Sequence, residues 1–286
     1  MKPIVVMILA SFLWLYSCSE RPEQTKIPME NLYAWCIVPF DSLERSPAER
    51  IAMLKRLGIN KYAYDWRKEH LNSTALELEL ARNNNIEVNA LWLWIDDDWD
   101  AVGKLNEPNE RLFEIIQEAS YQGQIWVSFN ANYFEHLTDD EAVAKGVEMI
   151  GYLSKRAKAL SCKVALYNHG DWFGEPENQV KIIKALPNEE LGIIYNFHHA
   201  HPQIDAFPEI VSTMMPYLWS VNLNGLRREG PKILTVGEGD FELEFINTLI
   251  KAGYTGDYGI LGHIENVDVE RVLKANLIGL KRLFNP

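Results

Sequence analysis

The sequence predicts a single-domain (β/α)8 TIM barrel. Short apolar runs alternate eight times with longer amphipathic segments, which is the pattern of parallel strands joined by crossover helices. Residues 32–286 provide the ~250 residues that one such barrel needs. The alternative is an open doubly wound sheet, but no glycine-rich phosphate turn opens any of the early helices.

Eight segments are predicted as strands because their β-branched and aromatic content suits a sheet that is buried on both faces. In a closed parallel barrel the carboxyl ends of the strands meet at one face, where barrel enzymes carry their active sites. The predicted strands are Leu32–Pro39, Lys61–Trp66, Glu87–Ile95, Gln124–Asn130, Lys163–Asn168, Gly192–Phe197, Leu218–Asn224 and Asp257–His263.

Helix signals lie between these strands. Ser46 and Pro47 form a cap and a first-turn proline, and Gly58 provides the stop. Thr138-Asp139-Asp140-Glu141 resembles a capping box before a helix that runs to about Leu160. Two further helices are predicted near the C-terminus: Phe241–Ala252 capped by Asp240, and a last helix from Asp268 to about Leu283.

The N-terminal residues predict export. Residues 1–17 contain one lysine and an apolar run too short to span a bilayer, as in a signal peptide. Leu15-Tyr16-Ser17-Cys18 resembles a bacterial lipobox, which implies cleavage before Cys18 and lipidation of its thiol. Residues 18–31 would then be the lipidated cysteine and a flexible tether. We therefore expect a lipid-anchored protein of the cell envelope, outside the cytoplasm; plain secretion and an uncleaved anchor are the alternatives.

Charge and cysteine content narrow the range of partners. The net charge of −12 becomes −12 − 1 = −13 when residues 1–17, with Lys2, are removed. A surface this acidic repels phosphate backbones, so nucleic acid is excluded as a partner. Cys36 and Cys162 each lie in an apolar run in the first and fifth strand regions, and we expect buried free thiols.

Two strand ends in the first half of the chain carry candidate sugar-binding residues. Asp65 and Arg67 follow the second strand, where they could form a surface ion pair or bind sugar hydroxyls. Trp92 and Trp94 share one side of the third strand, because strand side chains alternate. They could fill the barrel or form a wall on which the CH-rich face of a sugar packs.

The fifth and sixth strands end in histidine-rich segments. Asn168 and His169 end the fifth strand, and Glu175 follows at the start of a helix, where it could be only a helix-terminal acid. The sixth strand ends in Tyr195–His201, which includes Asn196, His198 and His199. We expect these segments to form part of an active-site wall.

The last two strands add amides and one more histidine. Asn222 and Asn224 fall on one side of the seventh strand by alternation, where buried amides need partners from the protein or from a polar ligand. His263 ends the eighth strand, and the preceding small residues leave room above the barrel.

Five segments carry a family resemblance: Tyr167-Asn168-His169-Gly170, Asn196 with His199, Val221–Asn224, Val236–Asp240 and Ala252–Gly256. In their order and spacing the chain resembles the xylose isomerase-like TIM-barrel superfamily, and within it a divergent subgroup of secreted lipoproteins. That superfamily includes sugar isomerases and epimerases and the metal-dependent apurinic endonucleases of the AP endonuclease 2 type. The resemblance implies a barrel acting on a small carbohydrate.

The resemblance breaks at the metal. The superfamily usually holds its divalent metal with two glutamates, an aspartate and a histidine, and the corresponding residues here are Tyr167, Asn196, Asn222 and Gly262. Amides neutralise a hard cation poorly, so the usual Mg²⁺ or Mn²⁺ site is predicted to be lost. Histidines remain instead, and His169, His199 and His263 are candidates for a softer transition metal or for metal-free acid–base work.

We therefore expect an extracytoplasmic carbohydrate-active enzyme that transfers a proton next to a carbonyl, as an isomerase, an epimerase or a lyase on an oxidised sugar. The alternative is a catalytically inactive barrel that serves as a surface sugar-binding lipoprotein; the oligomeric state stays open. His169 or His199 would be the base, and His263 and Glu175 the acid or metal partner. Substrate-binding residues would be Asp65, Arg67, Trp92, Trp94, Asn168, Asn196, His198, Asn222 and Asn224.

Overall fold

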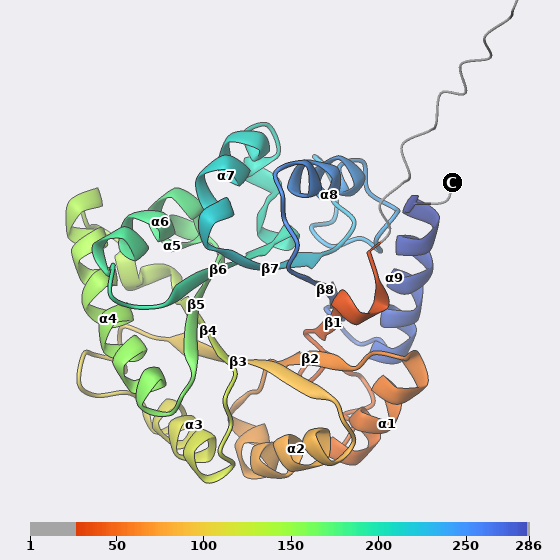
Figure 1. Ribbon diagram of the computed structural model, residues 1–286, viewed down its shortest axis with the longest axis horizontal. Coiled ribbons are helices and arrows are strands. Elements are labelled where there is room, and N and C mark those ends of the chain that lie inside the picture. Colours follow the sequence, from red (N-terminus) through yellow and green to blue (C-terminus); the bar gives the residue numbers. More distant parts are fainter. Residues whose placement is uncertain (1–26, 285–286) are drawn as a thin grey trace, which may run out of the picture.

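The computed structural model describes residues 27–284, and within them eight parallel strands close into a barrel in chain order (Figure 1). The (β/α)8 prediction is therefore confirmed. The signal peptide, Cys18 and the first part of the tether lie outside the described residues. The strands are β1 (Leu32–Trp35), β2 (Lys61–Tyr64), β3 (Glu87–Ile95), β4 (Gln124–Phe129), β5 (Lys163–Tyr167), β6 (Leu191–Asn196), β7 (Leu218–Leu223) and β8 (Asp257–Leu261).

Helices form the outer ring around this barrel (Figure 1). They are α1 (Pro47–Leu57), α2 (Leu71–Asn83), α3 (Glu107–Glu118), α4 (Asp139–Ala159), α5 (Asp171–Gly174), α6 (Pro176–Ala185), α7 (Phe207–Met214), α8 (Glu242–Lys251) and α9 (Val269–Phe284). Six short 3-10 turns join them: η1 (Met29–Asn31), η2 (Lys68–His70), η3 (Ala131–Phe134), η4 (Phe197–His199), η5 (His201–Gln203) and η6 (Met215–Tyr217). Over residues 27–284, none of the helices combines the length and apolarity needed to span a bilayer.

The helix caps follow the sequence signals with one exception. Ser46 and Glu49 form the capping box of α1, and Gly58 ends the helix at a φ of 69°, which a glycine adopts without strain. The predicted cap at Asp240 is wrong. The α8 helix begins at Glu242, and the Asp240 carboxylate instead accepts a hydrogen bond from Arg227 Nε at 3.1 Å.

The first strand is shorter than predicted. It ends at Trp35 because Cys36 adopts a φ of 56°, outside the extended region. The eighth strand likewise ends at Leu261, so His263 lies in the loop that follows it. Because both strands end early, the residues that follow β1 and β8 form part of the barrel mouth.

The barrel has an outer core and an inner one. The outer core lies between strands and helices, whereas the inner core fills the lumen with Tyr33, Trp35, Cys36, Ala63, Ala90, Trp126, Ala165, Tyr167, Ile194 and Leu261. Large aromatic side chains alternate there with alanines, which lets them interdigitate in a narrow barrel. Cys36 and Cys162 are both buried and free, as predicted.

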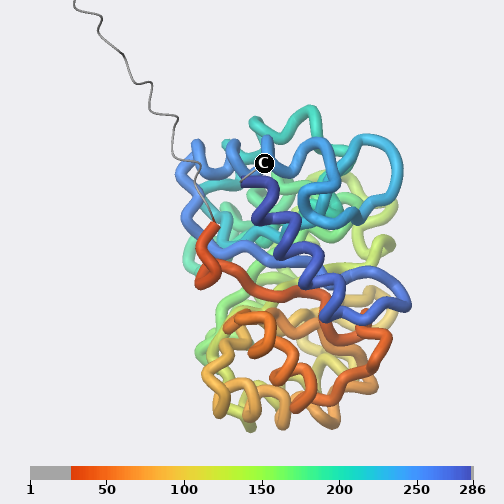
Figure 2. Tube along the Cα trace, turned by 90° about the vertical axis from the view of Figure 1, so that its right-hand side faces the viewer, coloured from red at the N-terminus to blue at the C-terminus, as the bar shows by residue number. Residues whose placement is uncertain are grey.

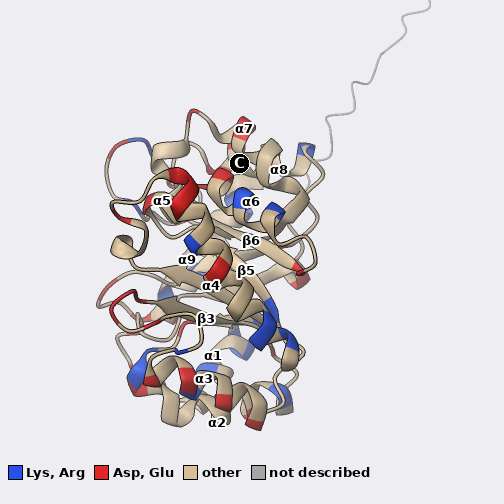
Figure 3. Cartoon of the chain, turned by 90° about the vertical axis from the view of Figure 1, so that its left-hand side faces the viewer, with Lys and Arg blue, Asp and Glu red and all other residues tan. Residues whose placement is uncertain are grey.

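The two ends of the described chain lie together. Strands β1 and β8 pair in register from Leu32 with Tyr258 to Trp35 with Leu261, and the first and last segments are neighbours in Figure 2. Ile27 packs against the outer core, so part of the predicted tether belongs to the barrel. Charged residues of both signs are interspersed on the helices and loops in Figure 3, while the lumen is occupied by uncharged side chains.

Candidate functional site

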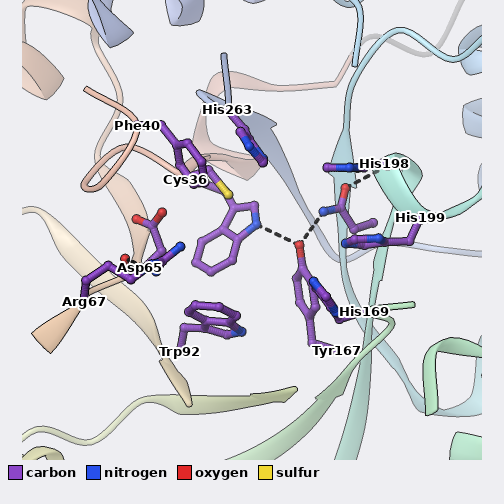
Figure 4. A pocket seen from close by; sticks show the side chains of 12 residues that line it. Cys36, Phe40, Asp65, Arg67, Trp92, Tyr167, His169, His198, His199 and His263 are labelled. Carbon is purple, nitrogen blue, oxygen red and sulfur yellow. Dashed lines mark hydrogen bonds between the residues drawn. The ribbon is translucent and has the colours of Figure 1, made fainter. Parts of the chain in front are cut away.

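A pocket opens at the carboxyl ends of the strands, with a cavity volume of about 90 Å³ (Figure 4). Strands β1, β3, β5 and β6 and the loops after β1, β2, β5, β6 and β8 supply its lining. The lining residues are Trp35, Cys36, Phe40, Asp65, Arg67, Trp92, Tyr167, His169, Asn196, His198, His199 and His263. The pocket therefore lies at the face where barrel enzymes carry out their chemistry.

The floor of the pocket is a hydrogen-bonded trio. Trp35 Nε1 donates to the Tyr167 hydroxyl at 2.9 Å, and the Asn196 side-chain amide donates to the same oxygen. Burial raises the pKa of Tyr167 well above its usual value, so the phenol stays neutral. This trio occupies two of the positions where the resembling superfamily places metal-binding carboxylates.

The other two positions are equally unsuited to a hard cation. Asn222 is buried, and its Oδ1 accepts a hydrogen bond from the Tyr33 hydroxyl at 2.7 Å. At Gly262 a side chain has no room, because a Cβ would lie 2.5 Å from Val269 Cγ2 and 2.7 Å from the Cys36 carbonyl oxygen. The residues present do not fit the carboxylate-bound metal of the superfamily that the sequence resembles.

Histidines form one wall of the pocket (Figure 4). The rings of His198 and His199 stack with centroids 4.5 Å apart, and the rings of His199 and His169 lie 4.7 Å apart. The Asn196 side chain fixes the turn that carries them, since its Oδ1 accepts from the backbone N–H of His198 at 3.1 Å. His263 lies apart from this group, with its ring 3.6 Å from Phe40 and 5.4 Å from His198.

The predicted sharing of a transition metal by His169, His199 and His263 is not supported by this arrangement. His169 and His199 are neighbours, but the ring neighbours of His263 are Phe40 and His198. Over residues 27–284, no three His, Cys, Asp or Glu side chains are placed so that they could hold a metal ion.

Burial keeps these imidazoles neutral. It lowers the pKa of His198 to about 3 and of His199 to about 2, and the neighbouring histidines lower both further because like charges repel. Burial also lowers the pKa of His169, an effect that Asp171 opposes, and the pKa of His263, which Glu265 opposes. At pH 7 the wall therefore offers lone pairs, not positive charge.

The opposite wall is formed by Asp65 and Arg67 (Figure 4). Asp65 Oδ1 accepts from the backbone N–H groups of Ile37 at 3.3 Å and Val38 at 3.2 Å. Asp65 Oδ2 is buried and has no hydrogen-bond partner among the described residues. Burial raises the pKa of Asp65 to about 7, although Arg67 lowers it in part. Asp65 can therefore hold a proton at neutral pH.

Arg67 and Trp92 support this wall. Arg67 Nη1 donates to the backbone carbonyl oxygens of Asp65 and Trp66, both at 2.9 Å, and its Cζ lies 4.7 Å from the centre of the Trp92 ring. Trp92 is itself fixed, since its Nε1 donates to Ser128 Oγ at 2.9 Å. The Arg67 guanidinium and the Trp92 ring are thus held in fixed positions in the lining of the pocket.

Eight of the predicted site residues line the pocket: Asp65, Arg67, Trp92, His169, Asn196, His198, His199 and His263. Trp94 borders a neighbouring cavity instead. Asn168 lies beneath the wall, where its Oδ1 accepts from the backbone N–H of Asn196 at 2.7 Å. Asn222 and Asn224 likewise bond within the protein, Asn224 to the carbonyl oxygens of Gly225 and Lys232.

The predicted acid Glu175 is not part of the pocket. Its side chain is exposed, and its Oε2 accepts from Gln203 Nε2 at 2.7 Å, which in turn fixes the buried Tyr195 hydroxyl through Gln203 Oε1. The Glu175 carboxylate thus helps to hold Gln203 of turn η5 in contact with Tyr195 of strand β6. Its place as the candidate acid is taken by Asp65.

Sequence reasoning named Tyr167 only as the position of a lost metal ligand, and it missed Trp35, Cys36 and Phe40. All three come from β1 or the loop after it, where no polar pattern marks a site. The available signal was strand alternation, which places Trp35 on the same side of the strand as Tyr33, and both side chains lie in the lumen. Burial, followed by the Asp65 carboxylate, raises the pKa of the Cys36 thiol, so Cys36 is an uncharged part of the lining.

The comparisons with known proteins give the class of fold. No protein-family model matches the chain, and no curated protein matches it by sequence. The chain shares its fold with solved xylose isomerase-like TIM barrels.

Three solved structures illustrate this similarity. Their sequence identities to this chain are low, so they show a shared fold only. The 3-keto-D-glucoside 4-epimerase YcjR of E. coli is 16% identical, with 88% of this chain and 99% of that one covered and a TM-score of 0.67. A D-psicose 3-epimerase is 15% identical, with 88% and 97% covered and a TM-score of 0.64. The IolI protein with a bound zinc atom is 11% identical, with 89% and 98% covered and a TM-score of 0.67.

Proposed function

We propose that this protein is a carbohydrate-active enzyme that transfers a proton at a carbon next to a carbonyl. The observation that carries the proposal is the pair of opposed walls, with neutral imidazoles on one side and the Asp65 carboxyl, with a pKa of about 7, on the other. A base and an acid that are both in the required protonation state at neutral pH are what such a reaction needs.

His169 is the base in this proposal. His198 and His199, with pKa values of about 3 and 2, bind a proton too weakly to remove one from carbon. The pKa of His169 is lowered by burial but supported by Asp171, and its ring lies beside that of His199. His198 and His199 then shape the wall and accept hydrogen bonds from hydroxyl groups.

Asp65 is the acid. As the C–H bond breaks, the proton goes to His169 and the electron pair moves into the carbonyl group, so that negative charge develops on its oxygen. Asp65 donates a proton to that oxygen, or to the reacting carbon or the leaving oxygen in the following step, and Arg67 stabilises the charge. The first step is common to isomerisation, epimerisation and elimination, the three reactions considered for this site.

The aromatic side chains orient the sugar. Trp35 and Trp92 present ring faces and edges at the floor, with centroids 6.5 Å apart, and Phe40 covers the pocket beside His263. Sugar CH groups pack on such rings while hydroxyl groups bond to Asn196, Arg67 and the histidines. A hydrophobic ligand without hydroxyl groups would leave these polar groups unpaired.

The structural neighbours support the substrate class. Two of them bear the names 3-keto-D-glucoside 4-epimerase and D-psicose 3-epimerase, which describe a change of configuration on a sugar. The first name describes an oxidised glucoside, in which a carbon next to the keto group changes configuration. We transfer to this chain the common element, a sugar that carries a carbonyl group.

Deuterium exchange tests the proposal. We expect 3-keto-D-glucose or a ketohexose such as D-psicose, incubated with the protein in D2O, to incorporate deuterium next to the carbonyl, measured by proton NMR. His169→Gln and Asp65→Asn should each abolish this exchange without loss of the fold by circular dichroism. Binding of these sugars without any exchange would instead favour the alternative of an inactive sugar-binding barrel, which the missing metal ligands support.

We further propose that the enzyme works outside the cytoplasm as a lipid-anchored protein, from the lipobox-like sequence that ends in Cys18. Labelling of cells with an alkynyl palmitate should mark the wild-type protein and leave Cys18→Ala unlabelled. Equal labelling of both proteins, or of neither, would refute the anchor.

A further inference from the structure

A second cavity adjoins the pocket. Its volume is about 390 Å³, and it shares Arg67, Trp92 and His169 with the pocket. The same three side chains border both spaces, so the boundary between the pocket and the side cavity lies at these residues. The proposed base His169 and the cation Arg67 thus lie at the junction.

The walls of the side cavity are mainly aromatic. Trp66 is fixed by a hydrogen bond from its Nε1 to the Trp92 carbonyl oxygen at 2.6 Å. The Trp94 ring lies 5.5 Å from that of Trp92 and 4.9 Å from that of His169, both between centroids. Three indoles placed in this way offer ring faces and edges to a ring-shaped ligand with an apolar face.

The polar groups of the side cavity are mostly committed within the protein. Asn106 Nδ2 donates to Asp100 at 2.9 Å, and Asn109 Nδ2 donates to the Trp94 carbonyl oxygen at 2.8 Å. Two cations differ: the side chain of the exposed Lys68 has no hydrogen bond or ion pair with a described residue, and Arg67, which likewise forms no ion pair with one, bonds to backbone oxygens through Nη1 alone. Its remaining N–H groups are available to an oxygen atom at the junction.

The two volumes suit different parts of one molecule. The pocket, at about 90 Å³, is well below the ~300–1,000 Å³ of a typical ligand site, whereas the side cavity at about 390 Å³ falls within that range. The pocket by itself is suited to one reacting unit. A substrate that ended there would leave the aromatic side cavity without a ligand group.

We infer that the side cavity bordered by Trp66, Trp92 and Trp94 is an aglycone subsite, so that a glycoside with a ring-shaped aglycone binds more tightly than a free monosaccharide, which fills the pocket alone. This inference rests on the proposed function, because it places the reacting sugar in the pocket. The glycosidic oxygen lies at the junction beside Arg67, and the aglycone ring packs against Trp94. An aryl group and a second pyranose both have the required apolar ring face.

Isothermal titration calorimetry with methyl, phenyl and glucosyl D-glucopyranosides, each as both anomers, tests the subsite. We expect a phenyl or glucosyl glycoside to bind at least tenfold more tightly than the methyl glycoside of the same anomer. Trp94→Ala should weaken binding of that ligand by about threefold to tenfold, the range of an aromatic contact, and leave the methyl glycoside unchanged. Trp94→Phe should retain most of the selectivity. The phenyl and glucosyl ligands separate an aryl from a sugar aglycone.

The matched control is Trp99→Ala, since Trp99 follows the same strand but is 70% exposed and borders neither cavity. It should change no affinity. Equal affinity for methyl, phenyl and glucosyl ligands, absence of binding by all of them, or an equal loss for all ligands in Trp94→Ala would overturn the subsite. Deuterium exchange is scored separately: selective binding without exchange refutes the reaction alone, and exchange without aglycone selectivity refutes the subsite alone.

Discussion

The two walls of the pocket respond to burial in opposite ways. On the wall after β2, burial raises the pKa of Asp65 to about 7, whereas on the wall after β5 and β6 it lowers the pKa values of His198 and His199 to about 3 and 2. In both cases the charged form is disfavoured because water is excluded. At pH 7 neutral imidazoles therefore lie opposite a carboxyl group that is about half protonated.

This difference suggests how the pocket could work without a bound metal ion in the proposed reaction. A divalent metal stabilises negative charge that develops on a substrate oxygen. Such a metal is usually bound by carboxylates, which this chain lacks at the corresponding positions. In the proposed reaction the Asp65 carboxyl would donate a proton to that oxygen, and the guanidinium of Arg67, held 4.7 Å from the centre of the Trp92 ring, would supply the positive charge. Removing one wall at a time therefore tests what each contributes.

The largest expected effect is that of the base. His169→Gln keeps a polar side chain of similar size but cannot accept a proton from carbon, so deuterium exchange should fall about 10²- to 10⁴-fold. NMR exchange rates at saturating sugar measure the effect. The control is His136→Gln, because His136 is an exposed histidine outside the pocket. A His169→Gln variant with more than a tenth of the wild-type rate would show that another group is the base.

Loss of the acid should come next. Asp65→Asn retains the oxygen that accepts from Ile37 and Val38 but has no proton to transfer, so we expect exchange to fall about 10²- to 10³-fold. The wild-type rate should also fall as pH rises through about 7, where Asp65 ionises. A pH profile that is unchanged in Asp65→Asn would contradict this role.

Asp65→Asn should lower the exchange rate but raise the stability of the fold at alkaline pH. The pKa of Asp65 is raised on folding, so its stabilising contribution is fully present below the unfolded value of 3.8 and is lost as pH rises through about 7. Asp65→Asn should therefore be more stable than the wild type at pH 8, by at most about 4 kcal/mol, and should lose that advantage near pH 4. Urea unfolding at both pH values measures the difference.

The histidine wall should show the reverse pH dependence. The pKa of His199 is lowered on folding, so its contribution is present above the unfolded value of 6.5 and is lost as pH falls toward about 2. His199→Asn cannot titrate, and its melting temperature should decline less than that of the wild type between pH 6.5 and 4. We expect a difference of at most about 6–12 °C, from about 3 kcal/mol at ~2–4 °C per kcal/mol for a chain of this size. Parallel melting curves for the two proteins over this range would refute the assignment.

Chelation should have the smallest effect. Since no three described His, Cys, Asp or Glu side chains could hold a metal ion, dialysis against EDTA should leave the exchange rate within a factor of two. Elemental analysis of the purified protein supplies the control. Loss of exchange on dialysis that is restored by one divalent metal would show that the pocket rearranges around an ion.

The sequence predicted the fold well because a barrel repeats one local pattern. Alternation separated Trp92, which packs against the inner core, from Leu91 and Leu93 of the outer core. The histidines after β5 and β6 line the pocket because parallel strands end at one face. The prediction failed where the strand ended. Asn224 and Glu175 lie in connections where backbone and side-chain partners, not alternation, decide the direction of a side chain.

The residues missed on β1 illustrate the opposite limit. Trp35 and Cys36 belong to an apolar run whose pattern is that of any buried strand, and the left-handed turn at Cys36 has no glycine to mark it. Their part in the pocket depends on contacts with Tyr167 and Asp65, which are 132 and 29 residues away in the chain. Such contacts follow from closure of the barrel.

The lack of space at Gly262 limits the substitutions that this barrel can accept at the end of β8. A side chain there would meet Val269 from α9 and the backbone of Cys36, which already bends into the left-handed region. A carboxylate at position 262 would require a smaller residue at 269 and a different path after β1. No single substitution can restore a metal-binding carboxylate at this strand end, so the chain is separated from metal-dependent barrels by several simultaneous changes.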